Sequence, residues 1–346
     1  MMRAAILYQT GKPLEIEELI LPQLKPGQIL VKVNYSGVCH SQLMEVRGLR
    51  GEDRYLPHLL GHEGSGTVVD IGPDVSKVKK DDEVILGWIK GHGIEAGGTV
   101  YKTKNGNKTI NSGGVTTFSD YTIVSENRVV KKPSELSNDI AVLFGCAIPT
   151  GAGLMMNQIA PQQPGQSLLI IGLGGIGMSG LIAARLFEFN TVIAVDIDVK
   201  KLELAKEFGA THTLIAGQPN LLDSIMDITN GKGVDHAMEA AGRVDTIELG
   251  FHAVKKGGGR LVFASHPKHG DKISLDPFDL ICGKKIEGSW GGASHPDEDI
   301  PKVAKLCCQG TLPFHRLLSE PLPLDQINHA LDALEQQKVM RALIQM

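Results

Sequence analysis

The sequence predicts an α/β protein with two parts, a β-rich part followed by a doubly wound parallel sheet. Its 346 residues are enough for two domains. The first 140 or so residues consist of short alternating segments broken by turns, whereas from about residue 165 apolar strands alternate with helical stretches. Strands that alternate with helices are typical of a parallel sheet covered on both faces.

The β-rich part is predicted from alternation and from turn signals. Apolar and polar residues alternate in 29–35 and 66–71, which favours half-buried strands. Turn-forming residues are concentrated at 24–28, 71–74 and 79–82. The stretch 88–117 is rich in Gly, Lys, Asn and Thr and indicates a loop or an exposed hairpin. No strand–helix–strand unit is predicted in this part.

The second part is predicted from apolar runs and helical periodicity. Its strands are expected at 168–171, 192–195, 234–238 and 260–264. Its helices are expected at 175–189, 199–208 and 243–254. An amphipathic helix near 325–336 and a last strand near 342–344 complete the predicted elements.

Composition excludes several classes of function. The chain has 35 Lys and Arg against 39 Asp and Glu, a net charge of −4, and no basic block, so it lacks the electrostatic footprint of a nucleic-acid-binding protein. The apolar run 168–184 is too short and too rich in glycine to cross a membrane. No signal peptide is expected at residues 1–10. Five cysteines, an odd number without disulfide-like spacing, favour a reducing compartment, and we expect a cytoplasmic protein.

A glycine-rich turn lies between a predicted strand and a predicted helix. Gly172, Gly174 and Gly177 form the pattern GxGxxG, in which the glycines allow a tight turn, a close approach to a pyrophosphate and close packing of helix on strand. The helix N-terminus, with Gly175, would face the phosphates. Asp196 ends the next strand and can accept ribose hydroxyls, and no arginine follows it, which favours NAD over NADP. A turn that serves packing alone is the alternative.

Three possible metal ligands stand in separate segments. Cys39, His62 and Cys146 each suit an ordinary buried position, and their spacing matches no local zinc motif. Brought together, two thiolates and one imidazole with an open fourth position would form a catalytic zinc site, which Glu63 could orient. The residues alone leave both interpretations open. Most other histidines, His58 among them, are interpreted as loop or surface residues.

Several short motifs together resemble one known family. The segments GVCHS, GHEGSG, GCAIPTGAG, GLGGIG, AVDID, EAAGR and VMRALI are similar to those of the zinc-dependent alcohol dehydrogenases of the medium-chain dehydrogenase/reductase superfamily, over nearly the whole chain. The resemblance implies a GroES-like catalytic domain that is split around a Rossmann domain. The expected domains are a first catalytic part at 1–147, an NAD-binding Rossmann domain at 148–289 and a second catalytic part at 290–346.

The resemblance also implies roles for individual residues. The implied zinc ligands are Cys39, His62 and Cys146, and the implied catalytic residues are Ser41 in a proton relay, Glu63 beside the metal and Trp88 on the pocket wall. The implied cofactor contacts are His40 and Arg341 to the pyrophosphate, Thr150 to the nicotinamide, Asp196 and Lys201 to the adenosine ribose, and Ser265 together with Gly172, Gly174, Gly175 and Gly177.

The chain departs from the family pattern in three places. No cysteine lies between Cys39 and Cys146, so the second, structural zinc of the family is not expected and one zinc per chain is predicted. Met44 stands where some members end the relay in a histidine. Ser112 and Gly113 stand at the lip of the substrate pocket, where large apolar residues are frequent, which indicates a wider and more polar pocket.

We therefore expect a zinc- and NAD-dependent alcohol dehydrogenase that transfers hydride reversibly between NAD and a polar, bulky or polyol-like alcohol. Its expected partners are a small-molecule alcohol, aldehyde or ketone and other copies of the chain, in a dimer or tetramer, and neither nucleic acid nor membrane. The alternatives are a zinc-free NAD(P)H-dependent quinone or enone reductase of the same superfamily and a non-catalytic nucleotide-binding protein.

Overall fold

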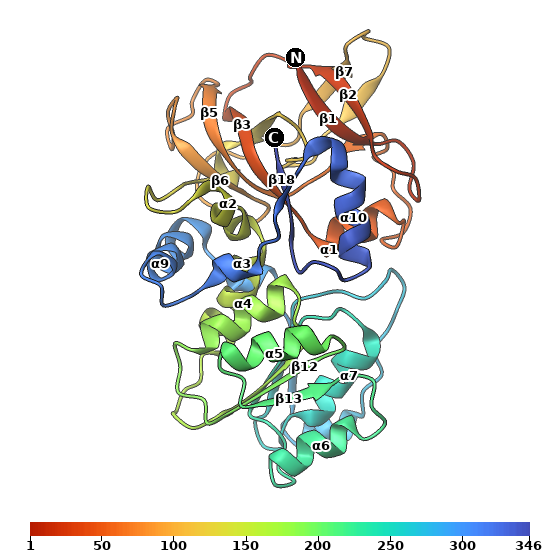
Figure 1. Cartoon of the computed structure of the whole chain (residues 1–346), viewed down its shortest axis with the longest axis vertical. Coiled ribbons are helices and arrows are strands. Elements are labelled where there is room, and N and C mark those ends of the chain that lie inside the picture. Colours follow the sequence, from red (N-terminus) through yellow and green to blue (C-terminus); the bar gives the residue numbers. More distant parts are fainter. The chain divides into compact units, whose positions relative to one another are not determined.

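The computed structural model describes residues 1–346 and divides into two compact units. The first unit comprises Met1–Cys146 and His295–Met346, and the second comprises Ala147–Ser294 (Figure 1). The domain boundaries expected from the sequence remain a prediction.

Two β-structures form the first unit. A closed barrel has the strand order β1 (Met2–Leu7), β2 (Glu15–Ile20), β7 (Val100–Thr103), β8 (Thr109–Asn111), β4 (His58–Leu59). A seven-stranded sheet has the order β10 (Val129–Lys131), β6 (Glu83–Gly87), β5 (Glu63–Ile71), β3 (Gln28–Val38), β18 (Ala342–Gln345), β17 (Pro321–Pro323), and β9 (Tyr121–Ser125) also pairs with β3. The predicted strands at 29–35, 66–71 and 342–344 are confirmed.

The stretch 88–117 contains the expected hairpin. Its strands β7 and β8 pair antiparallel, with Tyr101 opposite Ile110. Both side chains are fully buried in an apolar cluster with Ile6 and Leu59. The hairpin is therefore part of the barrel and not an exposed appendage.

Four α-helices belong to the first unit. They are α1 (His40–Val46), α2 (Asn138–Ala141), α9 (Pro296–Cys308) and α10 (Ile327–Glu335). Helix α10 packs against α1 and β18 (Figure 1), and its buried Leu331 and Leu334 join Leu43 and Val46 of α1 in one core cluster. It begins two residues later than expected because Leu324–Gln326 forms a 3₁₀ turn.

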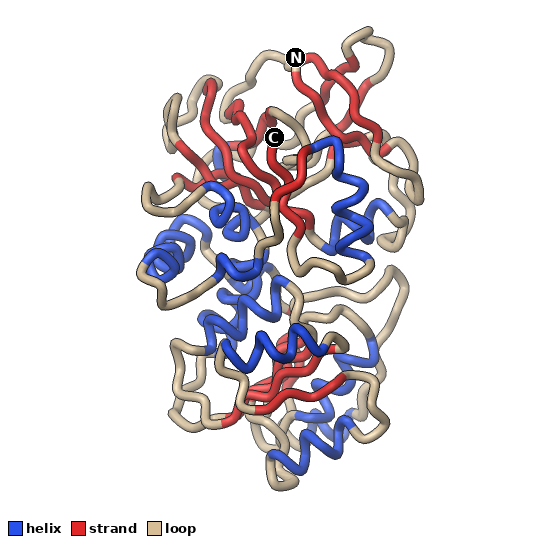
Figure 2. Tube along the Cα trace, viewed as in Figure 1, coloured by secondary structure: helices blue, strands red, loops and turns tan.

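The second unit is a six-stranded parallel sheet with helices on both faces (Figure 2). Its strand order is β13 (His212–Ile215), β12 (Thr191–Asp196), β11 (Ser167–Ile171), β14 (His236–Glu239), β15 (Arg260–Phe263), β16 (Lys285–Gly288). Its helices are α3 (Ala147–Gly153), α4 (Gly175–Ala184), α5 (Val199–Glu207), α6 (Leu221–Ile228), α7 (Val244–Ala253) and α8 (Pro277–Ile281), and a π-helix covers Leu154–Ile159. The order reverses between β11 and β14, where such sheets bind ligands.

Three expectations for the second unit were incomplete or wrong. Strands β13 and β16 were not predicted, because both are short strands at the sheet edges and lack a buried apolar run. Helix α6, between β13 and β14, was missed as well. Helix α4 was expected to reach residue 189 but ends at Ala184, because residues 185–187 form tighter i→i−3 hydrogen bonds before the chain enters β12.

No single helix is long and apolar enough to cross a membrane. The segments Asn138–Gly145 and Ala147–Ile159 pass the same test of length and composition only when taken together as a bent pair. Residues Val142–Gly145 and Ala147–Gly153 within them are all buried, as in core helices.

A buried carboxyl group ends the central strand β14. Glu239 is fully buried, and its Oε1 accepts hydrogen bonds from Ala241 N, Gly242 N and Thr246 Oγ1, each at 2.8 Å. Its Oε2 has no hydrogen-bond partner. Burial raises the pKa of Glu239 to about 7, although these hydrogen bonds oppose the rise.

This raised pKa predicts a pH-dependent stability. At pH values between about 4.5 and 7 the folded chain keeps a proton that the unfolded chain has lost, so the free energy of unfolding falls as the pH rises through this window. We expect a loss on the order of 1–3 kcal/mol from this group. Urea unfolding at pH 5 and pH 8 should show a smaller difference for Glu239→Gln than for the wild type. The exposed control Glu203→Gln should keep the wild-type difference. A Glu239→Gln variant whose free energy of unfolding changes between pH 5 and pH 8 as much as that of the wild type would contradict the prediction.

Candidate active site

Backbone pairing brings the three possible metal ligands together in the first unit. Cys39 follows β3 and His62 precedes β5, and these strands pair antiparallel with Ser36 opposite Gly64. Cys146 follows the 3₁₀ helix Val142–Gly145. A Cβ atom on Gly145 would lie 2.2 Å from the carbonyl oxygen of Leu86, so glycine is needed where this segment approaches the sheet.

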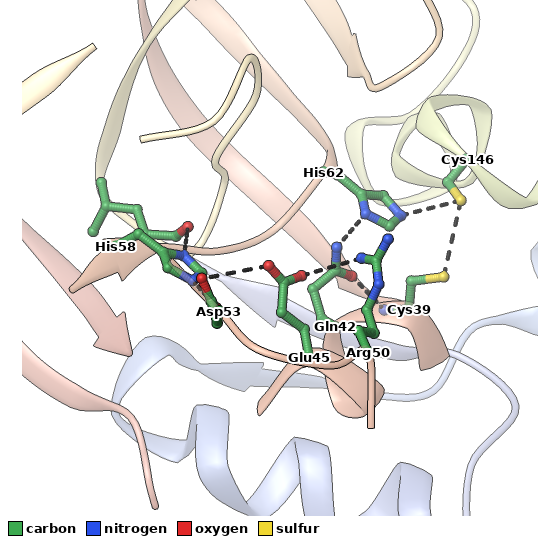
Figure 3. A network of polar contacts seen from close by, with 9 residues as sticks. Cys39, Gln42, Glu45, Arg50, Asp53, His58, His62 and Cys146 are labelled. Carbon is green, nitrogen blue, oxygen red and sulfur yellow. Dashed lines mark hydrogen bonds and ion pairs between the residues drawn. The ribbon is translucent and has the colours of Figure 1, made fainter. Parts of the chain in front are cut away.

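The three ligand atoms lie within 4.8 Å of one another. Cys39 Sγ is 3.9 Å from Cys146 Sγ, and His62 Nε2 is 3.2 Å from Cys146 Sγ (Figure 3). Both cysteines are buried, and all five cysteines of the chain are free. Two sulfurs and one imidazole nitrogen are donors that zinc prefers, and three protein ligands leave a position for substrate. The residues therefore fit a catalytic zinc ion.

The two thiols influence each other's ionisation. The hydrogen bond from the Cys146 thiol, together with the charge of Arg341, holds the pKa of Cys39 well below its ordinary value despite burial. The same hydrogen bond and burial raise the pKa of Cys146, because a second thiolate would lie beside the first. A divalent cation between the sulfurs would remove this repulsion.

A buried ion pair adjoins the ligands. Arg341 NH1 lies 2.9 Å from Glu63 Oε1, and both side chains are almost completely buried. Burial alone would lower the pKa of Arg341, but the charges of Glu63, Cys39 and Cys146 raise it. The sequence predicted Glu63 beside the metal and Arg341 at the pyrophosphate, without predicting their pairing. An arginine inside the apolar segment VMRALI was the available signal.

Two further predicted residues lie beside the ligands. Ser41, in the first turn of α1, has a buried Oγ without a hydrogen-bond partner. The Trp88 ring meets the His62 ring edge to face, with centroids 6.5 Å apart. His40 begins α1 and is exposed, and Met44, one turn later, is buried.

Sequence reasoning missed Gln42. This buried residue on α1 accepts a hydrogen bond from Cys39 N (3.2 Å) at Oε1, and its Nε2 contacts His62 Nδ1 (Figure 3). Its position three residues after Cys39, where a capping box places a glutamine, was the available signal.

A second network starts from the same helix (Figure 3). Glu45 of α1 pairs with Arg50 at 3.4 Å, and His58 Nε2 lies 2.8 Å from Asp53 Oδ2. His58 lies in β4 and is buried, so its interpretation as a loop or surface residue was wrong: pairing with Asp53 and with Leu59 O permits its burial. Glu45, Asp53 and His58 could also hold a metal ion, but each is already paired within the network.

The glycine turn of the second unit has the geometry that dinucleotide binding requires. Gly172 has φ +87°, and a Cβ there would lie 2.6 Å from Ala241 N. A Cβ on Gly177 would lie 1.8 Å from Gly172 O, so helix and strand pack without room for a side chain. Gly174 faces open space, and α4 begins at Gly175 without a side-chain cap. Its free N–H groups fit a pyrophosphate.

The other predicted cofactor residues of this unit lie in β12, α3, α5 and the loop after β15. Asp196 accepts hydrogen bonds from Leu173 N (2.6 Å) and Asp198 N (2.9 Å), with Lys201 Nζ 3.8 Å away. Thr150 has a buried Oγ1 without a partner, and Ser265 donates to Ala240 O at 3.2 Å. Their individual contacts to NAD, like those of His40 and Arg341, remain predictions.

The chain matches two protein families, "Alcohol dehydrogenase GroES-like domain" over residues 25–134 and "Zinc-binding dehydrogenase" over residues 175–308. An S-(hydroxymethyl)glutathione dehydrogenase of Escherichia coli O1:K1 is 32% identical over 370 residues, which cover 99% of both chains.

Solved structures show the same similarity. An alcohol dehydrogenase zinc-binding domain protein from Burkholderia ambifaria superimposes with a TM-score of 0.91 and 31% identity, covering 100% of this chain and 98% of the other. Benzyl alcohol dehydrogenase from Acinetobacter calcoaceticus superimposes with a TM-score of 0.89 and 29% identity, covering 100% of this chain and 99% of the other. The expected fold class, the zinc and NAD cofactors and the dehydrogenase activity are thereby confirmed. The chain belongs to the zinc-dependent alcohol dehydrogenases of the medium-chain dehydrogenase/reductase superfamily.

Proposed function

We propose that Cys39, His62 and Cys146 hold the zinc with which this dehydrogenase oxidises a bulky, polar or polyol-like alcohol. The observation that carries the proposal is the convergence of two buried sulfurs and one imidazole nitrogen, with a buried hydroxyl without a partner two residues after Cys39 on α1. When bound, the zinc supplies a Lewis acid that polarises the alcohol oxygen. The alternative of a zinc-free reductase gives no reason for two cysteines at these positions.

The proton of the alcohol is assigned to Ser41. Its Oγ is buried and has no other hydrogen-bond partner, so it is available to accept that proton and pass it on. Met44, one turn along α1, cannot accept a proton, and we therefore assign the last transfer to water.

The substrate class is inferred from the pocket residues and from the relatives. Trp88 offers a large aromatic surface next to His62. Ser112 Oγ bonds Thr116 Oγ1 at 3.1 Å and the neighbouring Gly113 is exposed, so this segment carries no large apolar side chain. The relatives are named for S-(hydroxymethyl)glutathione and for benzyl alcohol, both larger than ethanol.

A comparison of alcohols tests this substrate class. We expect kcat/KM for benzyl alcohol or S-(hydroxymethyl)glutathione to exceed that for ethanol by at least about tenfold, in line with one aromatic contact and the surface that it buries. Trp88→Ala should reduce this ratio and Trp88→Phe should keep most of it. If ethanol is the best of all alcohols tested, the proposed substrate class is wrong.

The proton relay has a separate test. Ser41→Ala should lower kcat by roughly 10²–10⁴, the range for one acid–base group, while zinc content stays that of the wild type. Ser41→Thr keeps the hydroxyl and should retain most activity. If Ser41→Ala instead turns over its best alcohol at the wild-type rate, or loses stability and not rate, Ser41 has no part in the relay.

We also propose that the chain forms a homo-oligomer through the edge of the second unit's sheet. Strand β16 is an edge strand, and an unpaired edge can pair with a second copy. Phe278, Ile281 and Trp290 nearby in sequence are 60%, 79% and 81% exposed. Ile281→Asp should therefore lower the mass measured by sedimentation equilibrium, and a monomeric wild type would contradict the proposal.

The free cysteines support a location in the cytoplasm, which cell fractionation can check.

A further inference from the structure

We propose that Gln42 lowers the zinc affinity of the site by favouring the tautomer of His62 whose proton lies on Nε2, the nitrogen that must bind the metal. This inference rests on the proposed ligand set. Gln42 is 3% exposed and lies between two of the ligands, in contact with the backbone of Cys39 and the ring of His62 (Figure 3).

The orientation of the Gln42 amide follows from its partner on Cys39. The backbone N–H of Cys39 can only donate, so the amide atom 3.2 Å from it is the carbonyl oxygen. The amide nitrogen is thereby left facing His62 Nδ1. The donor-only N–H of Cys39 therefore fixes the orientation of the amide.

The amide nitrogen in turn determines the tautomer of His62. An amide NH₂ group can only donate, so Nδ1 must accept and carries a lone pair. A neutral imidazole then has its proton on Nε2. This Nε2 lies 3.2 Å from Cys146 Sγ, to which its N–H can donate. Without metal, every one of these contacts is satisfied.

Zinc binding reverses the requirement. The nitrogen that faces the two sulfurs is Nε2, and it must offer a lone pair to the metal, so the proton must lie on Nδ1. Two donors then face each other, the Gln42 amide and His62 Nδ1. If the amide rotates by half a turn to accept from His62, the N–H of Cys39 loses its acceptor. One contact is lost in either arrangement.

A carboxylate at this position would remove the conflict, because it accepts from both donors at once. We therefore expect Gln42→Glu to bind zinc about 10–100 times more tightly than the wild type, the range that partners of metal ligands contribute. Competition with a chromophoric chelator measures this affinity. In the metal-free protein, ¹⁵N NMR of labelled histidine should place the His62 proton on Nε2 in the wild type and on Nδ1 in the variant.

Gln28 offers a matched control in the same unit. It is also buried, its Oε1 also accepts from the N–H three residues earlier (Lys25, 2.9 Å), and its Nε2 donates to Thr99 Oγ1 at 3.1 Å. Gln28→Glu makes the same chemical change without contacting a ligand. Its zinc affinity and His62 tautomer should equal those of the wild type.

The outcomes separate this inference from the proposed function. Equal zinc affinity of Gln42→Glu and wild type, or a His62 proton on Nδ1 in the metal-free wild type, would overturn the role of Gln42. A wild type that fails to bind one zinc per chain would instead contradict the proposed ligand set. The position of the His62 proton in the ¹⁵N NMR spectrum would still test the role of Gln42. If Gln42→Glu does not fold, the ¹⁵N NMR spectrum of the metal-free wild type alone tests the role of Gln42.

Discussion

The antiparallel pairing of β3 with β5 is the constraint on which the site depends. Cys39 lies one residue beyond β3 and His62 one residue before β5, so the register with Ser36 opposite Gly64 sets the distance between them. Strand β18 pairs with the other side of β3, with Ala342 opposite Val38, which places Arg341 at the same end. Because a slip of one residue turns every side chain of a strand to the opposite face, this register must hold for the ligands to meet.

A divalent cation would balance the charge of two thiolates at Cys39 and Cys146. The Glu63–Arg341 ion pair is neutral in itself, and an unpaired buried charge would be strongly destabilising. The two thiols differ, since the pKa of Cys39 is lowered and that of Cys146 is raised. One buried thiolate is stabilised by its neighbours, and a second needs a cation. The donor set is therefore matched in charge as well as in chemistry to zinc.

The sequence predicted what short motifs and buried runs determine. The glycine turn was predicted from its local pattern, and the central strands β11, β12 and β14 from their apolar residues. The roles of the metal ligands and of Ser41 were implied only by the resemblance of short motifs to a known family. Edge strands β13 and β16 have no such run, because one side of each lacks a neighbour. The contacts Glu63–Arg341 and Gln42–His62 join residues 278 and 20 positions apart, and only the fold determines such partners.

The first turn of α1 concentrates three tasks in four residues. Cys39 caps the helix and offers its sulfur, Ser41 offers a free hydroxyl, and Gln42 reaches back to Cys39 and His62. Successive side chains on a helix point about 100° apart, so one turn can aim them differently while its backbone stays fixed. A helix of seven residues is too short to be stable alone. Its position depends on the cluster of Leu43 and Val46 with α10, and on Arg47, which pairs with Asp332 and Glu335 of α10 at 2.7 Å. The packing of α10 against α1 thus helps to fix the geometry of the site.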